Sequence, residues 1–371
     1  MKFTATKEKL LPKLQEVLGV IPTRSTLPIL SNFLLETGDG KIKIGATDLD
    51  VAIISYAPAA ISKKGGLSVP AKMVADLVRE APEGDMTFTA SDNRLEIKLS
   101  TGVYKIGGPA AEEYPKLPDA NLNRQVKVNS ADLVNMIRKT SFAISNDETR
   151  PALNGAFWRA NENEMLMVAT DGHRLAKYTT RIKKFTGLSG DVIVPLKILT
   201  LVSRLVADGN GEVGIIFGDK NIVVNLGETV ISSRLIEGPY PNFEAVIPKD
   251  NDKHLLVDKE LLSSTLKRVS ILSSNLTHQV KFGLKKDKIE LSAANSDVGG
   301  EAKETIPAEF MGEEMEIGYN AQYLQEVLRQ MDGAVVDFSF SSAVAAGMVM
   351  PKEKKEGEEY LCLVMPLRLA D

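Results

Sequence analysis

The sequence predicts an α+β protein built from three repeated domains, each with two helices packed on antiparallel sheet. Its 371 residues exceed one typical domain and suit two or three. Four sequence markers also recur three times, in the same order and at the same spacing. Four markers in register indicate that a whole domain has been triplicated. We expect the domains to span residues 1–123, 124–250 and 251–371.

The first marker is an amphipathic segment that opens each repeat. The three copies read TATKEKLLPKLQEVLGVI, VNSADLVNMIRKTSFAIS and LVDKELLSSTLKRVSILS. Apolar residues recur at helical spacing in each copy, so we expect a helix. The N-cap candidates are Thr6, Ser130 and Asp258. Pro12 should kink the first helix or shift its start.

The second marker is a segment with an alanine before an acid or an amide, seen as KIGATDLDVAI, LMVATDGHRLA and IELSAANSDVG. The alanines are Ala46, Ala169 and either Ala293 or Ala294; Ala169 follows Ala46 by 123 residues, and Ala293 follows Ala169 by 124. The third marker is a short strand that leads into a helix ending near a glycine: VPAKMVADLVREAPEG, VPLKILTLVSRLVADG and IGYNAQYLQEVLRQMDG. Alternating strands close each repeat, as in VGIIFGDKNIVVNL. Each repeat is therefore expected to run helix, strands, helix, strands.

The composition is that of an ordinary globular protein, with 43% hydrophobic and 25% charged residues. The formal net charge is −4, so no bulk basic charge points to nucleic acid, although a local basic patch is compatible with it. The single cysteine, Cys362, excludes a disulfide framework within the chain and fits a reducing compartment. No apolar run has the length of a signal peptide core or a membrane span. We expect a cytoplasmic protein.

Three like domains in a row are expected to form an arc. Strands at the domain edges offer unpaired backbone groups at which a neighbour can pair. If two chains join head to tail, six domains close into a ring without open edges. An extended three-domain rod is the alternative that the sequence leaves open.

The stretch ATDGHRLA raises the question of an active site, because it places Asp171, Gly172, His173 and Arg174 in consecutive positions. A catalytic triad needs a nucleophile as well, and a metal site needs further ligands. No HExxH, GxSxG, P-loop or CxxC pattern occurs. The first repeat has ATDLDVA at the same place, so we interpret Asp48 and Asp171 as turn residues that accept backbone amides. No catalytic residue, cofactor or metal site is predicted.

Several stretches spread over the whole chain resemble the bacterial sliding clamps, the beta subunit family of DNA polymerase III. They are MKF at the start, RSTLPIL, GATDLD, LNG, ATDGHRLA and the closing LVMPLRL, in family order. The resemblance implies a head-to-tail homodimeric ring that encircles double-stranded DNA without sequence preference. It also implies a processivity factor, without a catalytic site, that tethers DNA polymerase III, other polymerases and repair proteins through short linear peptides. A separate clamp loader would open the ring.

A clamp of this kind should hold phosphates weakly, because topology rather than affinity prevents escape. Its helices should therefore face the hole and carry positive charge. We expect DNA contacts on the second helices of the first two repeats, and the resemblance adds two loop arginines. The candidates are Arg24, Lys72, Arg79, Arg150, Lys197 and Arg204, with Lys139 and Arg268 among further basic residues of the first helices. Ordinary solvated helix faces are the alternative.

The resemblance also assigns ATDGHRLA to a pocket for partner peptides. The pocket would lie between the second and third domains, with an apolar groove for a leucine or phenylalanine and with His173 and Arg174 as polar edges. Carried over residue by residue, it uses Leu153, Thr170, Gly172, His173, Arg174, Leu175, Pro241, Val246, Asn320, Tyr323, Leu363, Val364, Met365, Pro366, Leu367 and Arg368. Family members often carry an arginine where this chain has Ala245, so partner specificity should differ. Ala370 and Asp371 should alter the rim of the groove.

Ring closure needs the first domain of one chain to meet the third domain of the other. Candidate contacts are Tyr104 and Ile106 against Ile271 and Leu272, with core packing as the alternative. Two other functions rank below the clamp. One is an enzyme that uses His173 and Asp171, and the other is a monomeric adaptor that binds peptides without DNA.

Overall fold

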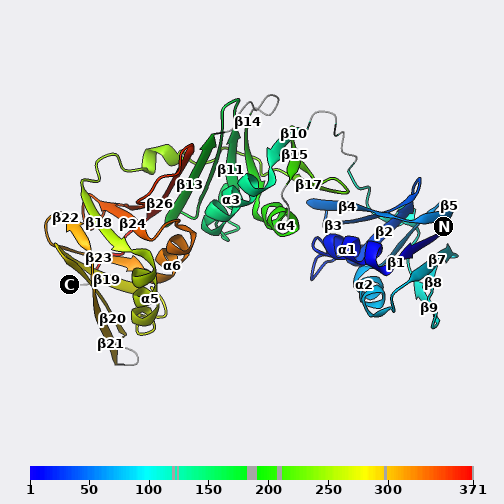
Figure 1. The fold of residues 1–371 in the computed structure, drawn as a ribbon, viewed down its shortest axis with the longest axis horizontal. Helices are drawn as coiled ribbons and strands as arrows, with labels where there is room; N and C mark the ends of the chain where they lie inside the picture. The colour runs from blue at the N-terminus through cyan, green and yellow to red at the C-terminus, as the bar shows by residue number, and fades with distance from the viewer. Residues whose placement is uncertain (119–121, 123–124, 182–189, 207–210, 296–298, 370–371) are drawn as a thin grey trace. The chain divides into compact units, whose positions relative to one another are not determined.

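The computed structural model describes residues 1–118, 122, 125–181, 190–206, 211–295 and 299–369 (Figure 1). These residues form two compact units. The first unit takes the described residues of 1–134 and 197–235, and the second takes those of 135–181, 190–196 and 236–369. The middle repeat is divided between the two units, because each of its sheets continues into a neighbouring repeat.

The described part of the chain has two α-helices in each repeat, in the segments where the first and third markers predict them. They are α1 (Lys7–Leu18), α2 (Ala71–Glu80), α3 (Ser130–Thr140), α4 (Leu196–Val206), α5 (Lys259–Ser270) and α6 (Ala321–Gln330). Short 3-10 turns occur at Pro28–Ser31, Ala111–Glu113, Ser141–Ala143, Pro151–Leu153 and Phe243–Val246. Pro12 lies inside α1, which begins at Lys7, so Pro12 does not shift the start of the helix.

The helix starts confirm one N-cap prediction and correct another. The Asp258 carboxylate accepts the Leu261 amide at 2.8 Å, as expected of an N-cap. In the second repeat the cap is Asn129, whose side chain accepts the first-turn amides, and the predicted Ser130 is the first helical residue. Thr6 occupies the N-cap position of α1, but its hydroxyl makes no capping bond.

The first unit contains two antiparallel sheets. The smaller has the order β5-β1-β7-β8-β9 and the larger the order β10-β15-β16-β17-β4-β3-β2-β6. The strands of the first repeat are β1 (Lys2–Thr6), β2 (Asn32–Thr37), β3 (Lys41–Thr47), β4 (Val51–Pro58), β5 (Ala60–Lys63), β6 (Gly66–Pro70), β7 (Asp85–Ser91), β8 (Arg94–Lys98) and β9 (Val103–Gly107). The second repeat adds β10 (Val126–Asn129), β15 (Glu212–Phe217), β16 (Asn221–Asn225) and β17 (Thr229–Arg234). The two repeats join where β17 pairs with β4.

The second unit is built in the same way. Its larger sheet has the order β14-β11-β12-β13-β26-β25-β24-β18-β22, and its smaller sheet the order β21-β20-β19-β23. The second repeat supplies β11 (Gly155–Ala160), β12 (Glu164–Thr170), β13 (Arg174–Arg181) and β14 (Gly190–Pro195). The third supplies β18 (Lys253–Asp258), β19 (Gln279–Lys285), β20 (Lys288–Asn295), β21 (Gly300–Pro307), β22 (Glu309–Met311), β23 (Met315–Asn320), β24 (Val335–Phe340), β25 (Gly347–Pro351) and β26 (Glu358–Val364). Here β13 pairs with β26.

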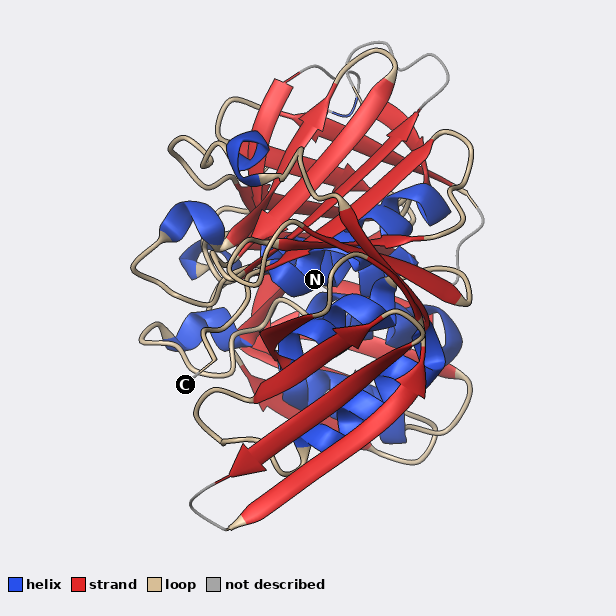
Figure 2. Ribbon diagram, turned by 90° about the vertical axis from the view of Figure 1, so that its left-hand side faces the viewer, coloured by secondary structure: helices blue, strands red, loops and turns tan. Residues whose placement is uncertain are grey.

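The helices of each terminal repeat pack together against its strands. In the first repeat α1 lies beside α2 and against β3 and β4, and it buries Leu10, Leu14 and Val17 there (Figure 1). In the third repeat α5 packs on α6 and on the strands, which lie in front of the helices in Figure 2. Burying each such aliphatic side chain contributes about 1.5–3 kcal/mol. The predicted repeat of two helices on antiparallel sheet is confirmed. None of the described helices is both long and apolar enough to cross a bilayer.

Candidate functional site

The turn between β12 and β13 is held by its own polar side chains. The Asp171 carboxylate accepts the backbone N–H groups of His173 at 2.8 Å and Arg174 at 2.9 Å. The Thr170 hydroxyl donates to the Arg174 carbonyl at 2.6 Å and accepts the Gly172 N–H at 3.1 Å. Gly172 has φ +91°, a conformation that suits glycine. The interpretation of Asp171 as a turn residue is confirmed, and Asp48 binds two amides of the first repeat in the same way.

Arg174 is buried and fastens this turn to α6. Its Nε donates to Asp171 at 3.1 Å, its Nη2 donates to the Phe142 carbonyl at 2.7 Å, and its Nη1 contacts the Glu326 carboxylate. The guanidinium also lies 4.6 Å from the centre of the Tyr323 ring, a cation–π distance. Arg174 was expected to offer a polar edge to a ligand. The structure instead commits its guanidinium to the protein, and exposed His173 remains as the polar edge.

Apolar residues from three segments meet beside the turn. Leu363 of β26 lies opposite Leu175 of β13, and the Met365 N–H donates to the His173 carbonyl at 2.8 Å. From the connector, which is the segment 235–252 between β17 and β18, Phe243 packs against Phe157 with ring centres 5.5 Å apart. One buried hydrophobic cluster contains Leu175, Leu363, Phe243 and Phe157. These close-packed side chains form the base of the groove.

These segments enclose a cavity of about 200 Å³. Its lining includes Leu153, Thr170, Gly172, His173, Arg174, Leu175, Pro241, Val246, Leu363 and Met365, all of which belong to the predicted pocket. It also includes Asn242, Phe243 and Ala346, which were not among the predicted residues. Phe243 could have been found as one of the two aromatic residues of the turn-rich connector, with Tyr240. Ala346 had no sequence signal, because it arrives from the loop between β24 and β25.

The other predicted pocket residues lie outside the lining of the cavity. Tyr323 nevertheless lies beside the cavity, because its ring stacks on the ring of His173, which lines it, with ring centres 6.1 Å apart. Asn320 instead caps α6, Val364 is fully buried, and the Leu367 N–H donates to the Gly318 carbonyl at 2.8 Å. Pro366 and Arg368 flank Leu367, which bridges Gly318 of β23, and the Arg368 carbonyl accepts from the Gln279 side chain of β19. Ala370 and Asp371, expected at the rim, lie outside the described residues.

The geometry does not support the enzyme hypothesis. Both oxygens of Asp171 accept hydrogen bonds from the turn and from Arg174, so this carboxylate holds the turn together and is not arranged as the acid of a triad. Within the described residues, no three His, Cys, Asp or Glu side chains gather as a metal site. What the site offers is a preformed apolar groove with few polar edges, which is suited to binding.

The residues predicted to contact DNA differ in how free their charges are. Arg24 and Lys72 are exposed, and Arg204 on α4 is exposed where its guanidinium lies over Gly19. Arg79 is exposed too, but it contacts Asp76 at 2.9 Å and Glu80 at 3.2 Å. Arg150 pairs with Asp147 at 2.9 Å, and the Lys197 ammonium contacts the Asp48 carboxylate. Carboxylates of the same chain therefore partly neutralise the charges of Arg79, Arg150 and Lys197.

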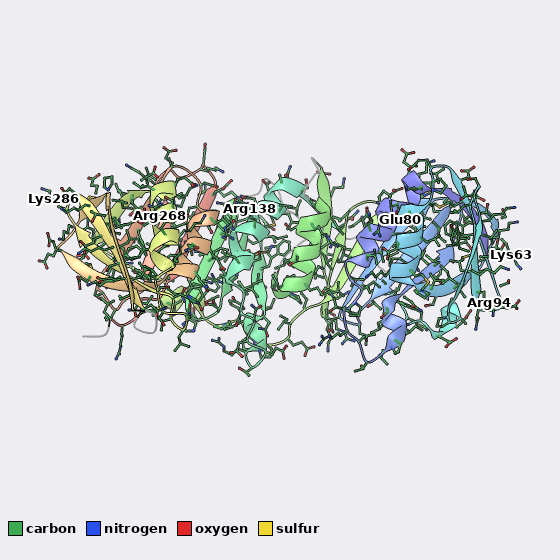
Figure 3. All side chains as sticks on the ribbon, turned by 90° about the horizontal axis from the view of Figure 1, so that it is seen from below. Lys63, Glu80, Arg94, Arg138, Arg268 and Lys286 are labelled. Carbon is green, nitrogen blue, oxygen red and sulfur yellow. The ribbon has the colours of Figure 1, made fainter. Side chains whose placement is uncertain are left out.

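Figure 3 shows two further cations of the helices, Arg138 on α3 and Arg268 on α5. Arg268 forms two hydrogen bonds with Glu304, at 3.0 and 2.6 Å. The neighbour of Arg138, Lys139, was counted among the basic residues of the helix face, and this is wrong. Its side chain is 1% exposed, pairs with Asp332 at 3.0 Å and lies 4.3 Å from the centre of the Tyr360 ring. Burial lowers the pKa of Lys139 despite that partner.

The fold and the groove together define a class of protein: a three-domain binding protein whose repeats join sheet to sheet. Family models of the DNA polymerase III beta subunit match residues 1–118 with the N-terminal domain, 127–242 with the central domain and 244–368 with the C-terminal domain. The beta sliding clamp of Caulobacter vibrioides is 32% identical over 377 residues, with all of both chains covered. That of Escherichia coli K12 is 30% identical over 371 residues, again with both chains fully covered.

Solved structures agree with these relatives. The crystal structure of the sliding clamp of Pseudomonas aeruginosa bound to griselimycin has a TM-score of 0.93 and 30% identity, and the match covers all of both chains. The chain belongs to the family of bacterial beta sliding clamps, the beta subunits of DNA polymerase III. It is a DNA sliding clamp, a processivity factor and not an enzyme.

Proposed function

We propose that two copies of the chain close head to tail into a ring around duplex DNA by pairing β9 of one copy with β21 of the other. The observation that carries this proposal is the order of the strands. At the two junctions within the chain, β17 pairs with β4 and β26 pairs with β13. In the repeat pattern β9 corresponds to β17 and β26, and β21 corresponds to β4 and β13. Both β9 and β21 stand at the ends of their sheets.

The side chains near these edges partly support the predicted interface. Tyr104 on β9 is 43% exposed and Ile271 at the end of α5 is 78% exposed, so both side chains are accessible to another copy of the chain. Leu272 follows Ile271 and is half-buried. Ile106 of β9, in contrast, is buried in its own repeat at 7% exposure, so it would anchor β9 to that repeat and not contact the other copy.

Within the ring, DNA would be held by weak contacts to phosphate. Arg24, Lys72 and Arg204 carry this role best, because they are exposed and no acidic contact of theirs appears among the described residues. Arg79, Arg150 and Lys197 would contribute less, because each already contacts a carboxylate of the chain. Contacts of this kind lose strength as salt rises, and they leave the ring free to slide.

The apolar groove would bind short linear peptides of polymerases and of other replication and repair proteins. A leucine or phenylalanine of the peptide would enter between Leu175, Leu363 and Met365, with His173 at the rim. Each peptide contact is weak, but a ring threaded on DNA keeps the partner at high local concentration near the primer end. Ala245 beside Val246 removes a cation that other members often carry, which would change the choice of partner.

Two further assignments belong to this proposal. The repeats would divide at the predicted bounds, 1–123, 124–250 and 251–371, although residues 123 and 124 lie outside the described part of the chain. The protein would act in the cytoplasm, where its DNA and polymerase partners are found. The single cysteine, Cys362, is a buried free thiol, which is compatible with a reducing compartment.

Retention on DNA tests the ring. The protein is loaded onto nicked circular DNA with a clamp loader and ATP, the salt is raised, and half of the sample is linearised. We expect protein to stay on the circles at high salt and to leave the linear DNA, because the link is topological. Equal loss from both would mean binding by charge alone, and the adaptor hypothesis would replace the ring.

Met365→Ala tests the groove against Met311→Ala as a control. The two methionines are similarly exposed, at 43% and 46%, but Met311 lies on β22, away from the cavity. Anisotropy of a labelled peptide from a polymerase should show about tenfold weaker binding for Met365→Ala, through lost apolar contact. Met311→Ala should bind normally. Deleting the chain from Leu363 is a poorer test, because Leu363 and Val364 are buried in β26. Unchanged binding by Met365→Ala would overturn the assignment of the groove.

A further inference from the structure

The junction of the first and second repeats contains the same turn as the peptide groove. The Asp48 carboxylate accepts the N–H groups of Asp50 at 3.1 Å and Val51 at 2.7 Å. The Thr47 hydroxyl donates to the Val51 carbonyl at 2.8 Å and accepts the Leu49 N–H at 2.9 Å. These bonds match, one for one, those of the turn between β12 and β13.

The strand that crosses the junction also takes the same place. The Arg234 N–H donates to the Asp50 carbonyl at 2.9 Å, as the Met365 N–H does to the His173 carbonyl. In the ladder between β4 and β17, Ser232 lies opposite Ala52, where Leu363 lies opposite Leu175 in the second junction. The backbone of the peptide groove is therefore present twice in this chain.

The first junction also has a cavity, of about 490 Å³. It is lined by Thr47, Leu49, Asp50, Val51, Ala52, Pro115, Lys116, Leu117, Pro118, Asn221, Ser232 and Arg234. Its lining is more polar than that of the peptide groove. Ser232 stands in place of Leu363 and Arg234 in place of Met365. A peptide chosen for the apolar groove would therefore fit poorly here.

Leu49 occupies a backbone conformation that a leucine rarely adopts. It has φ +84°, at the turn position where the second repeat has Gly172 with φ +91°. A bulky side chain at positive φ costs roughly 1–2 kcal/mol. The side chain recovers little of this by burial, because it is 47% exposed at the cavity. Strain of this kind, retained at a cavity, is typical of a residue that contacts a ligand.

We propose that the cavity at the first junction is a second binding site, which takes an extended acidic peptide segment. An aliphatic side chain of the peptide would pack between Leu49 and Leu117, and a carboxylate beside it would bind Arg234 and Lys116. This inference goes beyond the proposed function, because it does not depend on the apolar groove or on ring closure.

The charges of the cavity favour a carboxylate. Lys116 is exposed, and the Arg234 guanidinium approaches Asp50 only to 3.7 Å, beyond hydrogen-bond range, with both side chains more than 70% exposed. An exposed pair of this length is weak, so a ligand carboxylate can compete for the fork of donors. A phosphate backbone would use the same cations but would have no use for the exposed Leu49, which is why a peptide fits better.

Methyl NMR on the full-length protein tests the proposal with two probes. The probes are an acetylated, amidated hexapeptide of sequence SDLELG and its neutral counterpart SNLQLG. The acidic peptide should shift the methyl signals of Leu49 and Leu117 to saturation, and the neutral one should bind about tenfold more weakly. Signals of Leu363 report on the apolar groove in the same spectra, so failure at one site is distinguished from failure at the other.

Three variants complete the test. Arg234→Ala should weaken binding of the acidic peptide about tenfold, whereas Lys286→Ala, which removes one exposed cation on the hairpin between β19 and β20 (Figure 3), should leave it unchanged. Leu49→Gly should also weaken binding while the protein melts at the same or a higher temperature, which separates lost contact from lost fold. Equal binding of both peptides, shifts confined to Leu363, no saturable shift, or displacement of the peptide by a DNA oligonucleotide would each overturn the proposal.

Discussion

The two junction turns, Thr47–Val51 and Thr170–Arg174, share their backbone bonds but differ in what they hold. In both, a threonine hydroxyl and an aspartate carboxylate satisfy the amides of the turn. The second turn borders an apolar groove and the first a polar one. Duplication has kept the short polar residues that the turn needs and has changed the side chains around it. Fold and specificity are thus carried by different residues of the same segment.

The turns also differ in the cation that binds the second carboxylate oxygen of the turn aspartate. The second oxygen of Asp171 binds Arg174, which is 9% exposed and continues to Glu326 on α6. The second oxygen of Asp48 contacts Lys197 at the start of α4, whose side chain is 40% exposed. Each cation joins a turn to the second helix of the next repeat. Burial makes the arginine network the stronger of the two, because water screens it less.

The largest expected effect is the loss of this buried cation. Arg174→Ala leaves Asp171 and Glu326 without their partner and should lower the free energy of unfolding by about 3 kcal/mol. Urea unfolding followed by fluorescence of Trp158, the single tryptophan, reports on the second unit. Lys197→Ala should lower the free energy of unfolding by about 1 kcal/mol, measured as faster amide hydrogen exchange in the turn Thr47–Val51. If both variants lost equal stability, burial would not be what distinguishes the turns.

The glycine and leucine of the turns should respond in opposite directions. Gly172→Ala forces a side chain into positive φ and brings its Cβ to about 3.0 Å from the Arg150 guanidinium, so it should cost roughly 1–2 kcal/mol. Leu49→Gly removes the same kind of strain but frees the unfolded chain, so stability should stay level or rise by up to about 1 kcal/mol. Thermal melts of the two variants measure this. A large loss in Leu49→Gly would mean that Leu49 is held by packing and not strained.

The smallest expected difference concerns two buried tyrosines near the turns, Tyr114 from the segment after β9 and Tyr240 from the connector after β17. Burial raises the pKa of Tyr114 and of Tyr240, so both phenols stay neutral and can donate. Tyr114 accepts the Thr47 N–H and donates to the Asn32 carbonyl, each at 3.2 Å, whereas Tyr240 reaches the Val168 carbonyl at 3.4 Å.

Tyr114→Phe should therefore cost about 1–2 kcal/mol and Tyr240→Phe less than about 1, because only the first leaves two well-formed bonds unmade. Urea unfolding by circular dichroism compares them. The reverse order would show that the second turn depends more on its connector than its geometry indicates.

Much of the fold could be predicted from local pattern. Helical periodicity and the recurring third marker located the six α-helices of the described residues, and the aspartate of the ATD motif predicted the turn bonds of Asp48 and Asp171. The cap at Asn129 was missed, because asparagine and serine are adjacent and both suit an N-cap. For the groove, resemblance supplied most of the lining, but Ala346 could not be found. A small residue on a distant loop leaves no periodic or chemical signal.

The sequence by itself determined that a domain occurs three times, which segments are helices and strands, and which family the pattern resembles. These features depend on local propensity and on repetition, both of which can be seen along the chain. Only the tertiary structure decided which charges are free. Lys139 is buried against Asp332, Arg174 is held by Glu326, and Lys197 contacts Asp48. These partners lie more than a hundred residues apart, and the free energy of a charge depends on its neighbours and on its burial rather than on its place in the chain.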